Sequence, residues 1–305
     1  MGGGLATIRT NDISLVLSNP SLIDSSLHKH ISFSNAFFID GINIGNLNYG
    51  HYHKKIKTTL VYTFQYASYG KFEYRDISGN SLGTFRASDF NIQVGSSHYW
   101  NKLYYGINLK FIISQLANYS ALGLASDIAL GYHDNEKKIY FSIVLKNAGA
   151  QLKTYTKEQS REQLPIQLDA SFAKTFKKLP LTLAITAQHL QTWKLSYPKE
   201  SSSNLLGTNE PNKRKEIINN LFSHLVFGTE IQAGKPVRLR FGYNHLRRLE
   251  LASSYKKGMS GINAGLGLNI KQFGVDYAFG AYHQAGNDHL LTLKIKLDEF
   301  GKKAK

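Results

Sequence analysis

Apolar and polar residues alternate along much of the chain, so that every second side chain is apolar. In the stretch KLYYGINLKFIISQL, Lys102 to Leu116, one parity reads Leu103, Tyr105, Ile107, Leu109, Phe111 and Ile113, and the other carries Lys102, Asn108 and Lys110. A period of two residues predicts a strand with one apolar and one polar face. Ordinary strands run about five or six residues, whereas a tilted strand needs about 9–11 residues to cross a bilayer. We therefore expect a membrane-spanning strand with Leu109 toward lipid and Asn108 toward the interior.

About fourteen segments repeat this pattern. They lie near His28–Phe38, Ile42–His53, Thr58–Ala67, Phe85–Gly95, Leu103–Ile113, Leu122–Tyr132, Ile139–Asn147, Ile166–Phe176, Leu181–Leu190, Phe222–Ile231, Val237–Tyr243, Ile262–Ile270, Phe273–Ala281 and His289–Leu297. Transmembrane barrels are closed antiparallel sheets of even strand number, which leaves no strand edge unpaired in lipid. The pattern predicts an all-β, antiparallel up-and-down transmembrane barrel.

The connections between these segments are sorted by length. Even-numbered connections such as KKIK, DNEKK and KQ are short, whereas odd-numbered ones include Ser68–Thr84, Ala148–Pro165, Gln191–Leu221 and Asn244–Gly261. Outer-membrane barrels have short periplasmic turns and longer extracellular loops. The first odd connection, around Asp40–Gly41, departs from the rule because it is a tight turn. Within Gln191–Leu221, the piece KRKEIINNLF could form a short helix.

The net charge is compatible with several classes of partner, and the distribution of the basic residues along the chain excludes some of these classes. The chain has 37 Lys and Arg against 21 Asp and Glu, a formal charge of +16. The basic residues are divided between the short turns and the long outer loops, where Lys213, Arg214, Arg247 and Arg248 fall. On the barrel model they face lipid and lipopolysaccharide phosphates or an acidic partner, whereas nucleic-acid binding favours one basic face. No Ser/His/Asp set or carboxylate pair stands out, and cysteine is absent, so we expect neither an enzyme nor a cofactor.

Four histidines present the one candidate for metal chemistry. If Asp40–Gly41 is a two-residue turn, His28 lies opposite His53 and His30 opposite His51, which places four imidazoles on one face. Imidazoles suit zinc, copper or nickel. The alternative is a polar rim where histidines meet headgroups and water, and a slip of one residue would turn these side chains to the other face.

Four stretches resemble a known family. GGGLATIRTNDISLVLSNPSLI, GKFEYRDISGNSLGTFRASDFNIQVG, LKNAGAQLKTYT and AQHLQTWKLSY closely resemble PorQ-type outer-membrane proteins of the type IX secretion system, which belong with the fourteen-stranded FadL-like barrels. The resemblance runs from about residue 2 to the last strand. It implies an outer-membrane location in a Gram-negative bacterium of the Bacteroidetes type, and a non-enzymatic role in holding a PorZ-type surface protein.

The resemblance also implies a division of the chain. In FadL-like relatives the segment before the first strand folds into the lumen as a plug around an Asn-Pro element, a place that Asn19 and Pro20 would take here. We expect a plug over residues 1–27, a barrel over 28–297 and a basic periplasmic tail over 298–305. The chain opens inside the family's Gly-rich start, which implies that a signal peptide and the first mature residues precede it.

Two functions of different classes follow. In the first, the outer loops of the barrel dock a surface protein of the type IX attachment complex, and the residues we expect to carry the contact are Trp193, Tyr197, Lys213, Arg214, Arg247 and Arg248. In the alternative, the protein is a FadL-like outer-membrane transporter of hydrophobic molecules. A soluble secreted β-sandwich is a third interpretation, although such a fold has no reason to sort its loops by parity.

Overall fold

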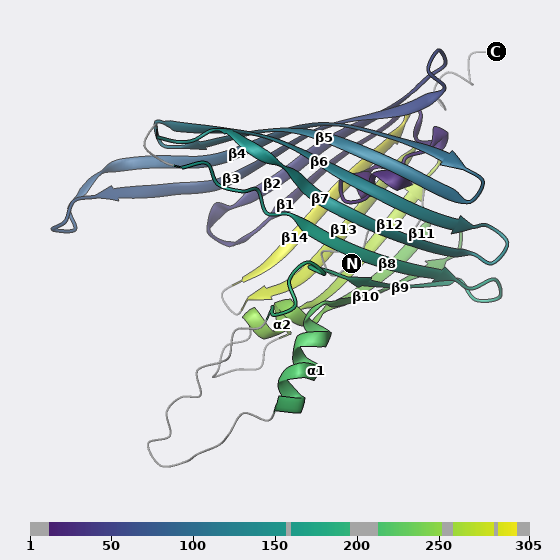
Figure 1. Ribbon diagram of the computed structural model, residues 1–305. Coiled ribbons are helices and arrows are strands. Elements are labelled where there is room, and N and C mark those ends of the chain that lie inside the picture. The colour runs from purple at the N-terminus through teal and green to yellow at the C-terminus, as the bar shows by residue number, and fades with distance from the viewer. Residues whose placement is uncertain (1–11, 157–159, 196–212, 252–258, 284–285, 298–305) are drawn as a thin grey trace.

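The computed structural model describes residues 12–156, 160–195, 213–251, 259–283 and 286–297. Fourteen antiparallel strands form one closed barrel in which each strand pairs with its neighbours in sequence and β1 pairs with β14 (Figure 1). They are β1 His30–Phe37, β2 Asn43–His53, β3 Thr58–Arg75, β4 Ser81–Trp100, β5 Leu103–Leu116, β6 Tyr119–Asp134, β7 Ile139–Lys153, β8 Gln167–Thr175, β9 Leu181–Ala187, β10 Leu225–Ala233, β11 Val237–Asn244, β12 Ile262–Ile270, β13 Phe273–His283 and β14 Gly286–Lys296. The predicted fold class and strand number are confirmed.

The two faces of the strands divide as the alternation predicts. On β5, Leu103, Tyr105, Ile107 and Leu109 are exposed on the outer surface, whereas Asn108 is completely buried on the lumen side. The same outer parity supplies a continuous band of exposed Leu, Ile and Phe residues on the neighbouring strands. In water such a band would be an extreme apolar patch, so its solvent is the hydrocarbon of a membrane. Of the described residues, none forms a helix that is both long and apolar enough to cross one.

The long connections all lie at one end of the barrel. The turns at the other end, 54–57, 101–102, 135–138, 176–180, 234–236 and 271–272, have five residues or fewer. The opposite end carries 154–166, 188–224 and 245–261, and it also carries tight turns at 38–42, 76–80 and 117–118. Length therefore identifies the long-loop end correctly, although several connections at that end are short.

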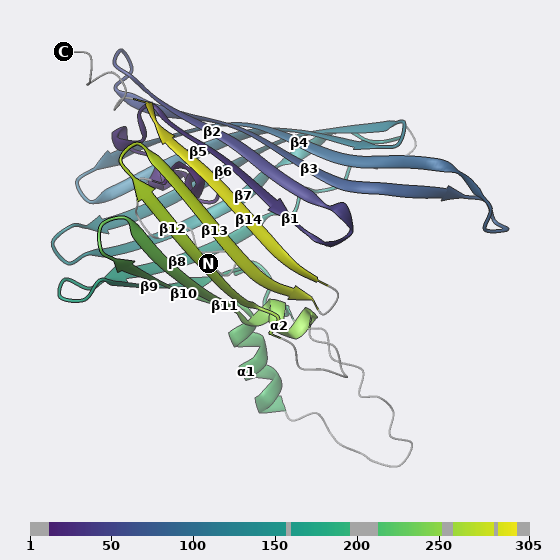
Figure 2. The same ribbon diagram turned by 180° about the vertical axis from the view of Figure 1, so that it is seen from behind.

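The predicted loop Ser68–Thr84 is wrong, because most of it belongs to strands. β3 and β4 continue past the barrel rim as a two-stranded ribbon that projects beyond the other strands (Figures 1 and 2). The ribbon ends in a turn around Asp76, whose carboxylate accepts hydrogen bonds from the backbone of Ser78 and Asn80. Together with a bond from the Asn80 side chain, these lower the pKa of Asp76.

Two short helices lie at the long-loop end. Helix α1, Lys213–Ser223, confirms the helix that KRKEIINNLF suggested, and Phe222 therefore lies in the last turn of a helix rather than at the start of a strand. Helix α2, His245–Leu251, follows β11 directly, and the Asn244 side chain caps it by accepting from the backbone N–H of Arg247 at 3.1 Å. The rings of Phe222 and His245 lie 5.9 Å apart, so the two helices pack against each other.

The membrane-facing parity yields a direct prediction. Leu109 is 55% exposed in the middle of β5, so Leu109→Arg should lower the free energy of unfolding in bilayers by about 2–4 kcal/mol, because the charge enters the midplane. Leu103→Arg lies on the same face at the end of the strand and should cost only about 0–1 kcal/mol. Denaturant titration in phospholipid vesicles checks both; equal costs at the two depths would contradict the assignment of the outer face.

Candidate functional site

The lumen contains the N-terminal segment Asp12–Leu27, which lies inside the barrel toward its short-turn end (Figure 1). Its three single-turn 3₁₀ helices are Ile13–Leu17 (η1), Pro20–Leu22 (η2) and Ser25–Leu27 (η3). Each begins after an Asp or Asn whose side chain accepts a hydrogen bond from the backbone two residues on, a local bond that favours turns over longer helices. The segment is therefore a chain of capped turns rather than a strand or a long helix.

Asn19 and Pro20 are both buried. Asn19 is fully buried and donates from Nδ2 to the Ser142 hydroxyl of β7 at 3.1 Å, while its Oδ1 accepts from the backbone and hydroxyl of Ser21. The Ser21 hydroxyl in turn lies 2.7 Å from the hydroxyl of Tyr140. Pro20 starts η2, a position that suits its fixed φ and its missing N–H. The two residues that the resemblance singled out thus join the segment to the wall of the barrel.

Glycines in the wall make room for the segment. A Cβ on Gly106 would come within 2.4 Å of the carbonyl carbon of Pro20, and one on Gly50 would come within 2.2 Å of the carbonyl oxygen of Leu27. A Cβ on Gly131 would lie 2.8 Å from the Ser21 hydroxyl oxygen. Because the first two contacts are with backbone atoms, no small side-chain movement could relieve them. The segment and the wall are complementary at close range.

Polar bonds fix the segment on two further sides. The Asn108 side chain on β5 donates to the carbonyl of Val16 at 3.2 Å, and Lys294 Nζ on β14 lies 2.9 Å from Asp12 Oδ2. Burial by itself would raise the pKa of Asp12, but the charge of Lys294 and the hydrogen bond from Ser14 outweigh it and leave that pKa lowered. Asp12 is therefore held as a carboxylate, and its pair with Lys294 is the charged tie between the segment and the wall.

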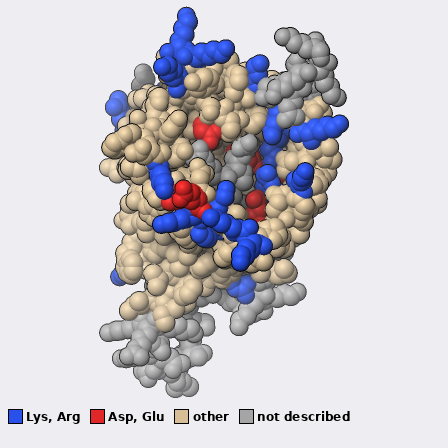
Figure 3. All heavy atoms as spheres, turned by 90° about the vertical axis from the view of Figure 1, so that its right-hand side faces the viewer, with Lys and Arg blue, Asp and Glu red and all other residues tan. Residues whose placement is uncertain are grey.

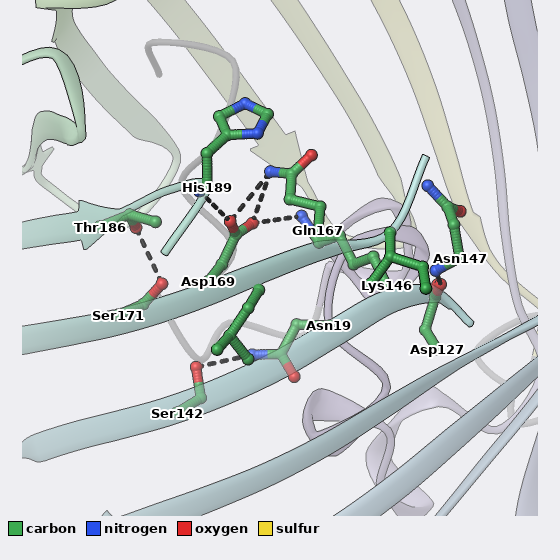
Figure 4. Close-up of polar contacts among 12 residues, drawn as sticks. Asn19, Asp127, Ser142, Lys146, Asn147, Gln167, Asp169, Ser171, Thr186 and His189 are labelled. Atoms are coloured by element: carbon green, nitrogen blue, oxygen red, sulfur yellow. Dashed lines mark hydrogen bonds and ion pairs between the residues drawn. The ribbon is translucent and has the colours of Figure 1, made fainter. Parts of the chain in front are cut away.

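Ion pairs join neighbouring strands on the lumen side of the wall, near the middle of the barrel. On one side, Lys110 Nζ lies 2.7 Å from Asp127 Oδ1, and the same oxygen accepts a hydrogen bond from the backbone N–H of Asn147. Lys146 lies 2.8 Å from Asp169 on the adjacent strands β7 and β8, and Figure 4 shows this pair next to the bond between Asn19 and Ser142. Each carboxylate is almost completely buried, so loss of its lysine partner should be strongly destabilising.

A second network lies across the lumen on β10, β11, β13 and β14. Arg240 bridges Glu230 at 2.7 Å and Asp276 at 3.1 Å, and Lys294 contacts both Asp276 and Asp12. The network is continuous from Glu230 to the N-terminal segment. The alternation pattern did not reveal these pairs. Charged residues at lumen positions inside predicted strands were the signal that could have identified them.

Toward the long-loop end the lumen wall of β5 and β6 carries a small apolar patch, beside Ser114, whose hydroxyl donates to Asp89. A Cβ on Gly123 would meet the side chains of Ile112 and Leu164 at 3.7 and 3.8 Å, an ordinary contact distance. Ala121 and Ala125 flank Gly123 on the same parity and are buried. On this side of the barrel the lumen wall therefore passes from a small apolar patch with polar neighbours, through ion pairs, to the N-terminal segment.

The residues expected to bind a partner are only partly described. Trp193 is exposed, and its ring stacks on His224 at 5.8 Å while its carbonyl accepts from Asn220 of α1. Arg247 and Arg248 are half-buried in α2, which packs on α1, so Trp193 and these two residues belong to one group of loops. Tyr197 and the side chains of Lys213 and Arg214 lie outside the described residues.

The proposed arrangement of four histidines is wrong by one residue. Asp40 has a left-handed backbone (φ 59°) within a 3₁₀ turn, and β1 pairs with β2 so that Ile31 lies opposite Tyr49. His30 therefore points into the lumen, away from His51 and His53. The rings of His28 and His51 lie 5.1 Å apart, and those of His51 and His53 lie 4.5 Å apart, but His28 Nδ1 accepts the backbone N–H of Tyr52. Within the part of the chain that the structure describes, no group of side chains is suited to hold a metal ion.

Comparison with solved structures identifies barrels of the same fold. The CymD monoaromatic hydrocarbon channel has a TM-score of 0.53 at 10% identity, with 97% of this chain and 94% of that chain covered. The deltaS2S3 mutant of the TodX monoaromatic hydrocarbon channel has a TM-score of 0.55 at 11% identity, covering 96% and 95%. A Pseudomonas aeruginosa FadL homologue has a TM-score of 0.50 at 9% identity, covering 97% and 96%. These likenesses establish a FadL-like barrel fold and no more.

Neither of the two sequence comparisons finds a relative. No family model matches the chain, and no curated protein matches it. The FadL-like part of the expected resemblance is thus supported by fold, whereas nothing found here supports its PorQ-type part.

The fit between wall and segment predicts how the segment can be displaced. Gly106→Val should push Pro20 away from β5, because its Cβ would meet backbone atoms of the segment. The readout uses a second substitution, Val16→Cys, at a position that is buried in the wild-type structure. Because the chain has no cysteine of its own, this thiol is the only one, and the rate at which a membrane-impermeant maleimide labels it is measured. We expect labelling to accelerate by about tenfold or more.

The matched control is Gly123→Ala, a lumen position where the nearest atom to a Cβ is 3.7 Å away. It should leave the labelling rate of Val16→Cys unchanged. If Gly106→Val labels no faster than this control, the segment is not held against β5 as described.

Proposed function

We propose that the protein is a FadL-like outer-membrane channel for small hydrophobic molecules, with the N-terminal segment as the plug of its lumen. The observation that carries this proposal is the segment Asp12–Leu27 inside a closed barrel whose fold matches hydrocarbon channels. The substrate class in the names of those channels is a property of those proteins, and its assignment to this chain is our inference. The lipid-facing band and the even strand number support a place in an outer membrane.

The lumen offers such a molecule a small apolar patch on one side. Ile112, Leu164 and Ala121 lie toward the long-loop end, whereas Ala125 lies opposite Lys110, where the layer of ion pairs formed by Lys110 and Lys146 begins. An apolar molecule gains nothing from buried charges that are already paired, so it would stop at this layer. Passage beyond it requires the segment to move or the molecule to leave through the wall.

Uptake of toluene by cells that lack a hydrocarbon channel of their own tests the proposal. Expression of the protein should raise the initial rate of toluene uptake at least about tenfold above cells with an empty vector, since facilitated transport replaces permeation through lipopolysaccharide. Ile112→Lys, which puts a charge into the apolar part of the lumen, should remove most of the gain. The barrel of this variant must still show the heat-dependent shift in electrophoretic mobility that folded barrels give.

Leu164→Met keeps the patch apolar and serves as the control, with uptake close to the wild-type rate. A folded wild-type barrel in the outer membrane that leaves toluene uptake at the empty-vector rate would rule out the channel.

A second candidate function is attachment of a surface protein, as the resemblance to PorQ-type proteins implies. The ribbon of β3 and β4 favours it, because Phe72 stacks on Phe85 at 5.3 Å and Tyr74 meets Phe85 edge-on at 6.4 Å. Phe85 shares its parity on β4 with Asp89 and Gln93, whose side chains face the lumen. The aromatic face of the ribbon is therefore on the side of the barrel mouth.

The other face of the ribbon is charged. Lys71 lies opposite Arg86, and Glu73 lies opposite Thr84, on the parity that continues the lipid-facing side of β4. We infer that this face meets the phosphates of lipopolysaccharide, while the aromatic face is left for a PorZ-type partner of the type IX attachment complex in a Bacteroidetes-type outer membrane. Aromatic side chains with exposed area, such as Tyr74 at 59%, are typical anchors of protein interfaces.

A pull-down from native outer membranes in mild detergent separates the two faces. Phe72→Ser/Tyr74→Ser/Phe85→Ser should reduce the yield of a PorZ-type partner at least about tenfold, because it removes the anchors. Lys71→Ser/Glu73→Ser/Thr84→Ser alters the opposite face of the same ribbon and should keep most of the yield. Equal recovery with both variants would exclude the aromatic face as the docking surface.

A further inference from the structure

Four strands, two of which flank β13, bring polar side chains to one place at the short-turn end of the lumen. Arg238 of β11, Asn269 of β12, Lys294 and Lys296 of β14, and His30 of β1 all lie at lumen positions. The register aligns them, because Asn269 lies opposite Gly274, Gly274 opposite Lys294, and Lys296 opposite His30. The arrangement is a continuous arc along the wall rather than a scatter of surface charges.

The arc lines a cavity of about 330 Å³ that also reaches Lys271 in the turn between β12 and β13. A volume of this size is near the lower end of the range of small-molecule sites. Gly274 keeps it open, since a Cβ there would lie 2.7 Å from Asn269 Oδ1 and 3.2 Å from Lys294 Cε. Figure 3, which looks toward this end of the barrel, shows Lys and Arg side chains around its mouth, with a few Asp and Glu side chains between them.

The charge of the cavity is not balanced by the described residues. Arg238, Lys271, Lys294 and Lys296 line it, against the single carboxylate of Asp12. Lys294 is held by Asp12 and Asp276, but the ion pairs formed within the described residues include none of the other three cations. Arg238 donates through Nε to Gln232 alone among described partners. Excess positive charge in a concave, partly enclosed space attracts anions.

An amide points to the same kind of ligand. Asn269 Nδ2 is buried and has no hydrogen-bond partner in the described structure, and a buried donor without an acceptor is costly. Across Gly274, the next lumen position along the wall is Lys294. A ligand that accepts hydrogen bonds and carries negative charge would satisfy both the amide and the cations.

We propose that this cavity binds a phosphate group. Arg238 and Lys296 hold the phosphate oxygens from two sides, Asn269 donates to a third, and Lys271 closes the site from the turn. Asp12 and Ile13 of the N-terminal segment form part of the cavity wall, so a bound anion lies directly against the segment. The phosphate is either a free anion of the periplasm or the headgroup of an inner-leaflet phospholipid.

Isothermal titration of the whole protein in dodecyl maltoside and phosphate-free buffer tests the site with inorganic phosphate. Saturable binding is expected, and Arg238→Gln/Lys296→Gln should raise the Kd at least about tenfold, because two charged hydrogen bonds are lost. Lys137→Gln/Lys138→Gln removes two charges from another turn at the same end and should leave the Kd unchanged. Lys271→Gln, at an exposed turn position that does not threaten folding, should raise it about threefold.

One variant should act in the opposite direction. Asp12→Asn removes the single carboxylate of the cavity wall, so phosphate should bind at least about threefold more tightly. A general loss of structure could not produce tighter binding. The variant therefore separates a direct electrostatic effect from damage to the barrel.

The source of the phosphate is decided by a second titration with dihexanoyl phosphatidic acid below its micellar concentration. If this lipid binds in the wild type, binds more weakly in Arg238→Gln/Lys296→Gln, and inorganic phosphate does not bind, the site takes a headgroup. Binding of inorganic phosphate assigns it to a free anion. Absence of saturable binding by both ligands, or equal affinities in the two double variants, would overturn the proposal, and neither result depends on hydrocarbon uptake.

Discussion

The structure depends on one constraint, which is that no backbone N–H or C=O can remain unpaired in hydrocarbon. Fourteen strands meet it by closing the sheet through β1 and β14. Closure at this strand number has a consequence for the interior. Barrels of eight strands are just wide enough to be filled by their own side chains, whereas those of about sixteen or more leave a channel. A fourteen-stranded barrel lies between these limits, and the N-terminal segment occupies part of the space that the wall leaves.

The strands of the wall and the N-terminal segment pack against each other and together fill this part of the lumen. Where the segment passes closest, the wall has glycine, as at Gly50 and Gly106. Where the wall is polar, the segment offers a backbone carbonyl or a capping side chain, as Val16 does to Asn108 and Asn19 to Ser142. The segment forms three turns instead of a regular element because its own Asp and Asn side chains satisfy its backbone. Such a piece can follow an irregular surface without leaving donors unpaired.

Features of the fold that follow from periodicity, such as the strands and their two faces, could be predicted from the sequence. Features that depend on a single backbone angle or on a pairing between distant residues, such as the register and the ion pairs, could not. The outer face of β5 could be assigned residue by residue, since burial in lipid enforces alternation. The direction of the His30 side chain could not be assigned, because the turn with the left-handed Asp40 shifts the pairing of β1 with β2 by one residue and places His30 on the opposite face from His51. The sequence of the ribbon predicts a loop because its charged and glycine-containing stretch lacks a regular apolar face. Pairs such as Lys110 with Asp127 join different strands, and alternation does not encode which charges meet.

The interactions that hold the N-terminal segment in the lumen determine how much free energy is needed to displace it. Ile13, Val16, Leu22, Ile23 and Leu27 are buried within it, and full burial of such side chains is worth roughly 1.5–3 kcal/mol each. A ligand at a concentration of one hundred times its Kd shifts an equilibrium by only about 2.7 kcal/mol. An anion that competes with Asp12 for Lys294 would therefore loosen the charged end of the segment without expelling it. Complete opening of the lumen requires work on the apolar turns themselves, which only a larger partner or a force on the chain could supply.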